Sequence, residues 1–159
     1  MTSANKLSVG ARAPEFMLRD GRGDEWRLAD QRGKTVVLLF YPGDETPICT
    51  RQLCSVRDRW EDYAATGAEV VGISTNTVES HKAFAEHHDL PLRLLSDADG
   101  EVRRAYGALS LIPNKTARSV FVIDPAGLIA YRKVQPLGIF RPKDDEIIEE
   151  IRKAGVNSQ

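Results

Sequence analysis

The sequence has 159 residues, 42% of them apolar and 28% charged, and a net charge of -1 from 22 basic and 23 acidic side chains. These values are typical of one folded domain, expected over residues 1–159, and exclude an intrinsically disordered chain. A net charge this close to zero creates no field that would attract nucleic acid or an anionic membrane, so we expect neither as a partner.

The N-terminal residues 1–13 contain no apolar run long enough for a signal peptide, and no stretch of the chain approaches the length of a membrane span. We therefore expect a cytoplasmic protein. The chain has only two cysteines, Cys49 and Cys54. Two are too few for a disulfide-stapled secreted scaffold, and in a reducing compartment they indicate catalysis, metal binding or redox sensing.

The first predicted elements are two short extended segments at residues 16–18 and 25–28, which we interpret as an added β-hairpin. The run VVLLF at Val36–Phe40 is apolar throughout. A continuous apolar run of this length is typical of a strand that is buried on both faces of an α/β sheet.

After a turn-rich loop, apolar residues recur at three- and four-residue spacing, namely Leu53, Val56, Trp60 and Tyr63. This spacing places them on one face of a helix, which is predicted to end near Gly67. A second buried strand is predicted at Glu69–Ser74, and a second helix at Val78–His88, before Leu90 and Pro91. The chain up to this point alternates between strands and helices.

The pattern changes in the second half of the chain. A short strand at residues 92–95 and a short helix through Tyr106 are followed by two runs, 118–124 and 128–134, which predict a hairpin around the turn DPAG. A surface loop is expected at residues 138–145. A C-terminal helix is then marked by its apolar positions, Ile147, Ile148 and Ile151.

A βαβ half followed by a ββα half is the element order of the thioredoxin fold. The fold class predicted from the sequence is therefore α/β, with a mixed central sheet flanked by helices and an added N-terminal hairpin.

Cys49 lies where the predicted helix begins, with Thr46 as a possible N-cap and Pro47 as its first residue. Free backbone N–H groups and the positive end of the helix dipole favour an anion there, and the thiolate is the reactive form of cysteine. A second interpretation is that Cys49 is a small core residue, since it shares the apolar face of Leu53 and Val56. The residues alone leave both open.

The segment FYPGDETPICTRQLCSVRD, residues 40–58, resembles the active-site segment of the peroxiredoxins, where a proline, a threonine and the reactive cysteine are spaced P-x-x-x-T-x-x-C. Pro42, Thr46 and Cys49 match this spacing at every position. A cysteine five residues later, here Cys54, is similar to the bacterioferritin-comigratory, or Q-type, subfamily. The later segment RSVFVIDPAGLI begins with Arg118 at the place of the family's active-site arginine.

The resemblance implies a thiol-dependent peroxidase for hydrogen peroxide and organic hydroperoxides, acting in antioxidant defence. Cys49 would attack the peroxide and become a sulfenic acid, and Cys54 would resolve it as an intramolecular disulfide that thioredoxin reduces. Pro42, Thr46 and Arg118 would form the peroxide-binding site. No metal or organic cofactor is implied, and we expect a monomer.

Two positions depart from the family pattern. Gln52 stands where a glutamate usually helps to hold the arginine, and Ile48 stands where a small residue is common. Gln52 keeps an acceptor without the charge, and Ile48 narrows access to the sulfur.

Three histidines raise the possibility of a metal site, namely His81, His87 and His88. His87 and His88 are adjacent and hence about 100° apart on a helix, with no carboxylate or thiol at an obvious ligand spacing, so we expect no metal.

Two other functions compete with the peroxidase. A thiol–disulfide oxidoreductase would use C-x-x-C, whereas four residues separate Cys49 from Cys54. A redox-sensing binding protein could use the same disulfide to signal to a partner.

Overall fold

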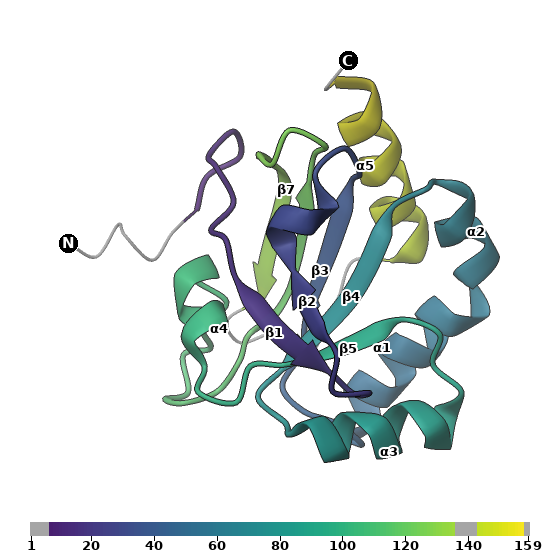
Figure 1. The fold of residues 1–159 in the computed structure, drawn as a ribbon, viewed down its shortest axis with the longest axis vertical. Coiled ribbons are helices and arrows are strands. Elements are labelled where there is room, and N and C mark those ends of the chain that lie inside the picture. The colour runs from purple at the N-terminus through teal and green to yellow at the C-terminus, as the bar shows by residue number, and fades with distance from the viewer. Residues whose placement is uncertain (1–6, 136–142, 158–159) are drawn as a thin grey trace.

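The computed structural model describes residues 7–135 and 143–157. Figure 1 shows a central sheet with helices on both sides. In chain order the elements are β1 (Met17–Asp20), β2 (Glu25–Arg27), the 3-10 turn η2 (Leu28–Gln31), β3 (Val36–Phe40), α1 (Pro47–Asp58), α2 (Trp60–Ala65), β4 (Glu69–Ser74), α3 (Val78–His88), β5 (Arg93–Ser96), α4 (Glu101–Tyr106), β6 (Arg118–Ile123), β7 (Ile129–Gln135) and α5 (Asp144–Asn157).

The seven strands form one mixed sheet in the order β2-β1-β5-β4-β3-β6-β7. The three central strands β3, β4 and β5 are parallel to one another. The hairpin β6–β7 is antiparallel and pairs with β3, and the N-terminal hairpin extends the other edge through β5. This arrangement confirms the fold class predicted from the sequence.

The position of β3 inside the sheet explains why its sequence is apolar throughout. Successive side chains of a strand point to opposite faces of the sheet. Val37 and Leu39 lie in a core that also contains residues of α1, α2, α3 and α5, whereas Val36, Leu38 and Phe40 lie in a second core under α4 and the N-terminal segment. Figure 1 shows α4 on one side of the sheet and the other four helices on the opposite side.

The structure corrects the predicted helix after Cys49, which is two helices rather than one. Arg59 separates α1 from α2 with φ -106° and ψ 18°. Its guanidinium binds Asp62 and Asp145 at 2.7 Å each. Leu53, Val56 and Tyr63 are all buried, so the predicted apolar face is real. The break was invisible in the sequence because the apolar spacing continues across it.

Smaller differences concern the ends of elements. The predicted strand at 92–95 is β5, shifted by one residue, and α3 ends at His88 because Asp89 has a left-handed backbone, φ 52°. Of the loop predicted at 138–145, residues 138–142 lie outside the described residues, and α5 already begins at Asp144.

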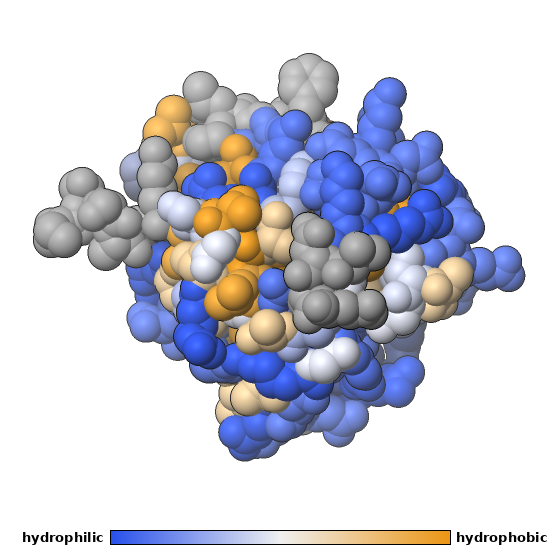
Figure 2. Space-filling view, turned by 90° about the horizontal axis from the view of Figure 1, so that it is seen from above, coloured by the Kyte–Doolittle hydropathy of each residue, from blue (hydrophilic) through white to orange (hydrophobic). Residues whose placement is uncertain are grey.

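The surface of the described residues carries few large apolar side chains. Figure 2 shows one face on which hydrophilic residues predominate and apolar ones gather mainly in one area. The exposed large apolar side chains are Val9, Met17, Leu111 and Ile112. Within residues 7–135 and 143–157, no helix combines the length and apolar character needed to cross a bilayer.

Candidate active site

Cys49 lies in the first turn of α1, as the sequence predicted. Thr46 is the extended N-cap, φ -76° and ψ 147°, and Pro47 is the first helical residue. Pro is favoured there because its missing N–H would have no partner in the helix and its fixed φ suits the helix. The side chain of Cys49 is 0% exposed and belongs to the core beneath α1. Cys49 therefore lies both at the start of a helix and in the core.

Arg118 reaches the sulfur from the neighbouring strand. The antiparallel register pairs Phe40 of β3 with Ser119 of β6, so Arg118 lies beside the end of β3, where the chain turns toward Cys49. Its Nη1 donates a hydrogen bond to Cys49 Sγ at 3.3 Å, and the residue is only 5% exposed. A permanently charged guanidinium in this position stabilises a thiolate over a thiol.

Gln52 holds the guanidinium in place. Its Oε1 accepts from Arg118 Nη1 at 2.7 Å, and the side chain is 2% exposed. Gln52 lies one turn after Cys49 on α1, so the sulfur and the amide oxygen face the same arginine nitrogen. An amide therefore positions this arginine without the negative charge that a glutamate would add.

Two buried donors beside Cys49 have no hydrogen-bond partner in the described part of the chain. They are Arg118 Nε and the hydroxyl of Thr50, the residue that follows Cys49. A buried donor without a partner is costly, so such groups mark a place where a polar ligand can bind. Sequence reasoning missed Thr50, and its only sequence signal is that it adjoins Cys49.

The other residues of the predicted peroxide site lie on the loop between β3 and α1. Pro42 and Thr46 are both exposed, whereas Cys49 and Arg118 are buried. The Thr46 hydroxyl donates to the carbonyl of Gly43 at 3.1 Å. The described hydrogen bonds thus bring Cys49, Gln52 and Arg118 together. The hydroxyl of Thr46 is instead hydrogen-bonded within its own loop.

Cys54 lies on the same helix as Cys49 and is partly buried. Both thiols are free. The side chain of Cys54 packs against the core that contains Cys49.

A buried network anchors this loop to α3, and sequence reasoning missed it. The carboxylate of Asp44 accepts from Tyr41 at 2.6 Å and from Ser80 at 2.7 Å, and it lies 2.8 Å from His81 Nδ1. Burial alone would raise the pKa of Asp44, but the hydrogen bonds from His81, Tyr41 and Ser80 lower it below its ordinary value. Burial and the Asp44 carboxylate together raise the pKa of Tyr41.

A second histidine cluster lies at the surface beside the same loop. Glu45 accepts from His87 Nδ1 and from His88 Nε2, each at 2.9 Å. These hydrogen bonds lower the pKa of Glu45. The spacing of the two histidines in the sequence revealed no carboxylate beside them, because Glu45 comes from 42 positions upstream of His87.

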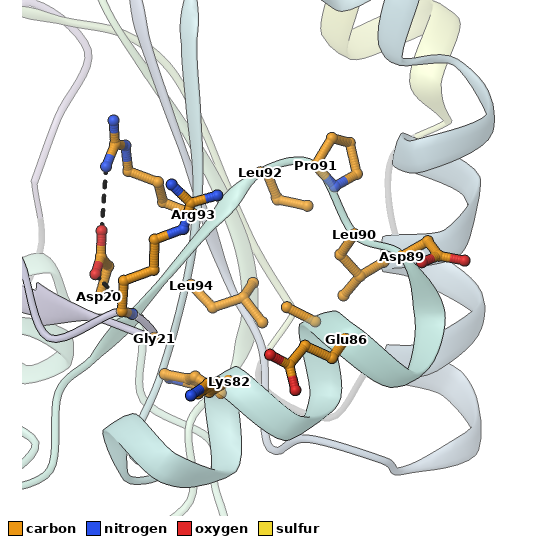
Figure 3. Close-up of a pocket in the computed structure, with 13 residues that line it drawn as sticks. Asp20, Gly21, Lys82, Glu86, Asp89, Leu90, Pro91, Leu92, Arg93 and Leu94 are labelled. Atoms are coloured by element: carbon orange, nitrogen blue, oxygen red, sulfur yellow. Dashed lines mark hydrogen bonds and ion pairs between the residues drawn. The ribbon is translucent and has the colours of Figure 1, made fainter.

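A cavity of about 440 Å³ lies elsewhere, between α3, β5 and the turn after β1. Figure 3 shows it bordered by charged side chains, among them Arg93, which forms an ion pair with Asp20 at 3.1 Å. Lys82 and Glu86 also line it, and Cys49 and Arg118 do not. The sulfur of Cys49 therefore lies outside this cavity.

Comparison with known proteins identifies the family of the chain. The sequence pattern of the AhpC/TSA family matches residues 9–132. The chloroplastic peroxiredoxin Q of Triticum aestivum is 46% identical over 127 residues, which cover 79% of this chain. That of Sedum lineare is 45% identical over 125 residues, covering 78% of this chain and 67% of the relative. The chain spans 58% of the length of the Triticum protein.

Solved structures agree as well. Peroxidoxin BcpB from Mycobacterium tuberculosis is 31% identical with a TM-score of 0.83, over 94% of this chain and 99% of that one. The bacterioferritin comigratory protein of Xanthomonas campestris, 22% identical with a TM-score of 0.76 over 93% of this chain and 94% of that one, shares the fold. The chain therefore belongs to the AhpC/TSA family, among its Q-type, or bacterioferritin-comigratory, peroxiredoxins.

Proposed function

We propose that the chain is a thiol peroxidase that reduces hydrogen peroxide and organic hydroperoxides with the thiolate of Cys49. The observation that carries the proposal is the buried guanidinium of Arg118, 3.3 Å from Cys49 Sγ at the start of a helix. Both the arginine and the helix start favour an anionic sulfur. The relatives named peroxiredoxin Q support the same choice.

In the first step the thiolate of Cys49 attacks the terminal oxygen of the peroxide, ROOH. An S–O bond forms, the O–O bond breaks, and the leaving alkoxide takes up a proton to become ROH. The sulfur is oxidised to a sulfenic acid and the peroxide is reduced by two electrons. The unpartnered Arg118 Nε is a donor for the peroxide oxygens, and Thr46 and Pro42, exposed on the loop before Cys49, complete the peroxide site.

In the second step the thiol of Cys54 attacks the sulfenic sulfur, a disulfide forms, and water leaves. An external dithiol protein, which we take to be thioredoxin, then reduces the disulfide and is itself oxidised. No metal or organic cofactor takes part in this cycle. Because both thiols must be reduced again after every turnover, we place the activity in the reducing cytoplasm, in antioxidant defence. Cys49, Cys54 and Arg118 all come from one chain, so a monomer suffices for the cycle.

The test is the intact mass of the protein after one equivalent of hydrogen peroxide. Wild type should lose two mass units on forming the disulfide. Cys49→Ser should not react, because a serine hydroxyl is neither ionised nor a soft nucleophile. Cys54→Ser should gain one oxygen as a persistent sulfenic acid. Near-normal peroxide consumption by Cys49→Ser would refute the assignment.

A second assay separates the enzyme from a redox sensor. With thioredoxin, its reductase and excess peroxide, an enzyme consumes many equivalents of peroxide per chain. A sensor that uses the same disulfide to signal would stop after about one equivalent.

A further inference from the structure

Three potential metal ligands converge where the end of α3 meets the loop before α1. They are Glu45, His87 and His88. His87 Nδ1 and His88 Nε2 each lie 2.9 Å from a different oxygen of the Glu45 carboxylate. All the ligand atoms lie within 4.8 Å of one another. The two imidazole rings lie with their centroids 4.2 Å apart.

Adjacent histidines can share a ligand here because their two rings use different nitrogens. His88 is the last residue of α3, and Asp89 then adopts a left-handed conformation. The ring of His87 uses its near nitrogen, Nδ1, and the ring of His88 its far nitrogen, Nε2. Their different reach compensates for the angle between neighbouring positions, so both rings face Glu45.

The donor set fits a transition-metal ion. Two imidazoles and one carboxylate are a set that Zn²⁺ accepts as three protein ligands with a fourth position open to water. Imidazole nitrogens also discriminate against Mg²⁺ and Ca²⁺, which prefer oxygen. Tetrahedral bonds of about 2.0–2.1 Å would place the ligand atoms roughly 3.3 Å apart.

The cluster can reach that geometry by side-chain rotation. The side chains of His87 and Glu45 are 66% and 47% exposed, so they can move without disturbing a core. That of His88 is 19% exposed and packs edge-on against Phe84, which fixes its ring. The carbonyl of His88 accepts from Arg57 of α1 at 2.7 Å, which holds the end of α3 in place.

We propose that Glu45, His87 and His88 form a binding site for a divalent transition-metal ion, with Zn²⁺ the best-fitting. The ion would replace the two hydrogen bonds to Glu45 with metal–ligand bonds and would tie the loop to the end of α3. Glu45 lies four residues before Cys49, so the site adjoins the active site without containing the sulfur.

The test is metal binding by the full-length reduced chain, with Co²⁺ as a spectroscopic probe and Zn²⁺ in calorimetry. We expect one Co²⁺ per chain, visible d–d bands of a tetrahedral nitrogen–oxygen site, no thiolate charge-transfer band, and displacement by Zn²⁺. Glu45→Gln, His87→Gln and His88→Gln should each weaken Zn²⁺ binding by roughly tenfold or more.

Glu86→Gln is the matched control, because Glu86 is an exposed carboxylate on the same helix beside His87 and outside the cluster. It should bind Zn²⁺ as wild type does. A thiolate charge-transfer band, loss of binding in Cys49→Ser or Cys54→Ser, or unchanged binding in both histidine variants would overturn the site. No measurable binding by wild type would overturn it too.

A consequence for catalysis follows, and it rests on the proposed function. If Cys54 reaches Cys49 only after the start of α1 opens, an ion that binds the closed form stabilises it and slows that opening. Zn²⁺ should then slow disulfide formation in wild type and leave the rate in His87→Gln unchanged. Equal slowing in His87→Gln would mean that Zn²⁺ acts at the thiols, which would overturn this consequence. The binding test needs no peroxide, so the site and the peroxidase can fail separately.

Discussion

At the scale of single residues, one nitrogen of Arg118 lies between the sulfur of Cys49 and the side chain of Gln52. Arg118 Nη1 is shared between the sulfur, at 3.3 Å, and the amide oxygen of Gln52, at 2.7 Å. The shorter bond goes to a neutral acceptor, so the positive charge remains available to the thiolate. Removing the arginine should therefore affect the sulfur directly.

We expect Arg118→Ala to slow peroxide attack by roughly 10- to 100-fold, because a charged hydrogen bond of about 1.5–3 kcal/mol is lost. Arg118→Lys should restore part of the rate, since it keeps the charge and loses the planar fork. The measurement is stopped-flow peroxide reduction, together with the pH dependence of Cys49 alkylation. The control is Arg51→Ala, an exposed arginine two residues from Cys49. Equal rates in Arg118→Ala and wild type would refute the role of the guanidinium.

A second residue-scale prediction concerns acid stability. The Asp44 side chain is 2% exposed, and its hydrogen bonds hold its pKa below the ordinary value. Asp44 therefore contributes stability in full above its unfolded-state pKa of about 3.9, and this contribution is lost as the pH falls through the folded-state pKa. Asp44→Asn should cost about 2 kcal/mol at pH 7 and less at acidic pH.

The measurement is the thermal unfolding of wild type and Asp44→Asn from pH 7 down to acidic pH. Glu86→Gln, a change of an exposed carboxylate, is the control. A difference between Asp44→Asn and wild type that does not shrink in acid would contradict the assignment.

At the scale of elements, α1 carries both cysteines, and its geometry opposes their disulfide. Residues five apart on a helix have Cα atoms roughly 8 to 9 Å apart. A disulfide needs no more than about 7 Å. Cys49 and Cys54 both lie within Pro47–Asp58, so the start of α1 must unwind before they can bond.

We expect hydrogen exchange to show the amides of residues 50–57 losing protection in the oxidised form, while β3 stays protected. A disulfide-bonded chain cannot keep those helical hydrogen bonds, whereas β3 is paired on both sides by β4 and β6. Cys54→Ser treated with peroxide is the control, because it forms no disulfide. Equal protection of residues 50–57 before and after oxidation would mean that the two cysteines do not pair within one chain.

At the scale of the whole molecule, hydrogen bonds dock the C-terminal helix α5 onto α1 and α2. Asp144 at its first turn accepts hydrogen bonds from the hydroxyls of Ser55 on α1 and Tyr63 on α2, the latter at 2.7 Å. Its neighbour Asp145 faces solvent and pairs with Arg59. The two carboxylates are adjacent but differ in burial, and they form a matched pair of variants.

Asp144→Ala should destabilise the fold by about 2 kcal/mol, because two partly or fully buried hydroxyls lose this acceptor. Asp145→Ala should change stability by about 0.5 kcal/mol or less, as expected for an exposed ion pair. Denaturant unfolding of the two variants provides the comparison. Similar losses would show that the burial of Asp144 does not matter to the docking of α5.

The sequence by itself predicted most of the elements and the position of Cys49 at the start of a helix. The apolar run at Val36–Phe40 and the helical spacing of Leu53 and Val56 reflect burial, which depends on local periodicity and is therefore visible in the chain. The start of α1 at Pro47 was also visible, because proline and an N-cap residue are local signals. The family resemblance added Arg118, which no local pattern would have singled out.

Only the tertiary structure decided how distant residues meet. The pairing of β3 with β6 places Arg118 at the sulfur, and the packing of α3 against the loop brings His81 to Asp44 and His87 to Glu45. The contact between Arg59, at the break between α1 and α2, and Asp145 of α5 likewise joins distant positions. These arrangements arise from sheet register and helix packing across more than thirty positions, and local periodicity carries no information about them.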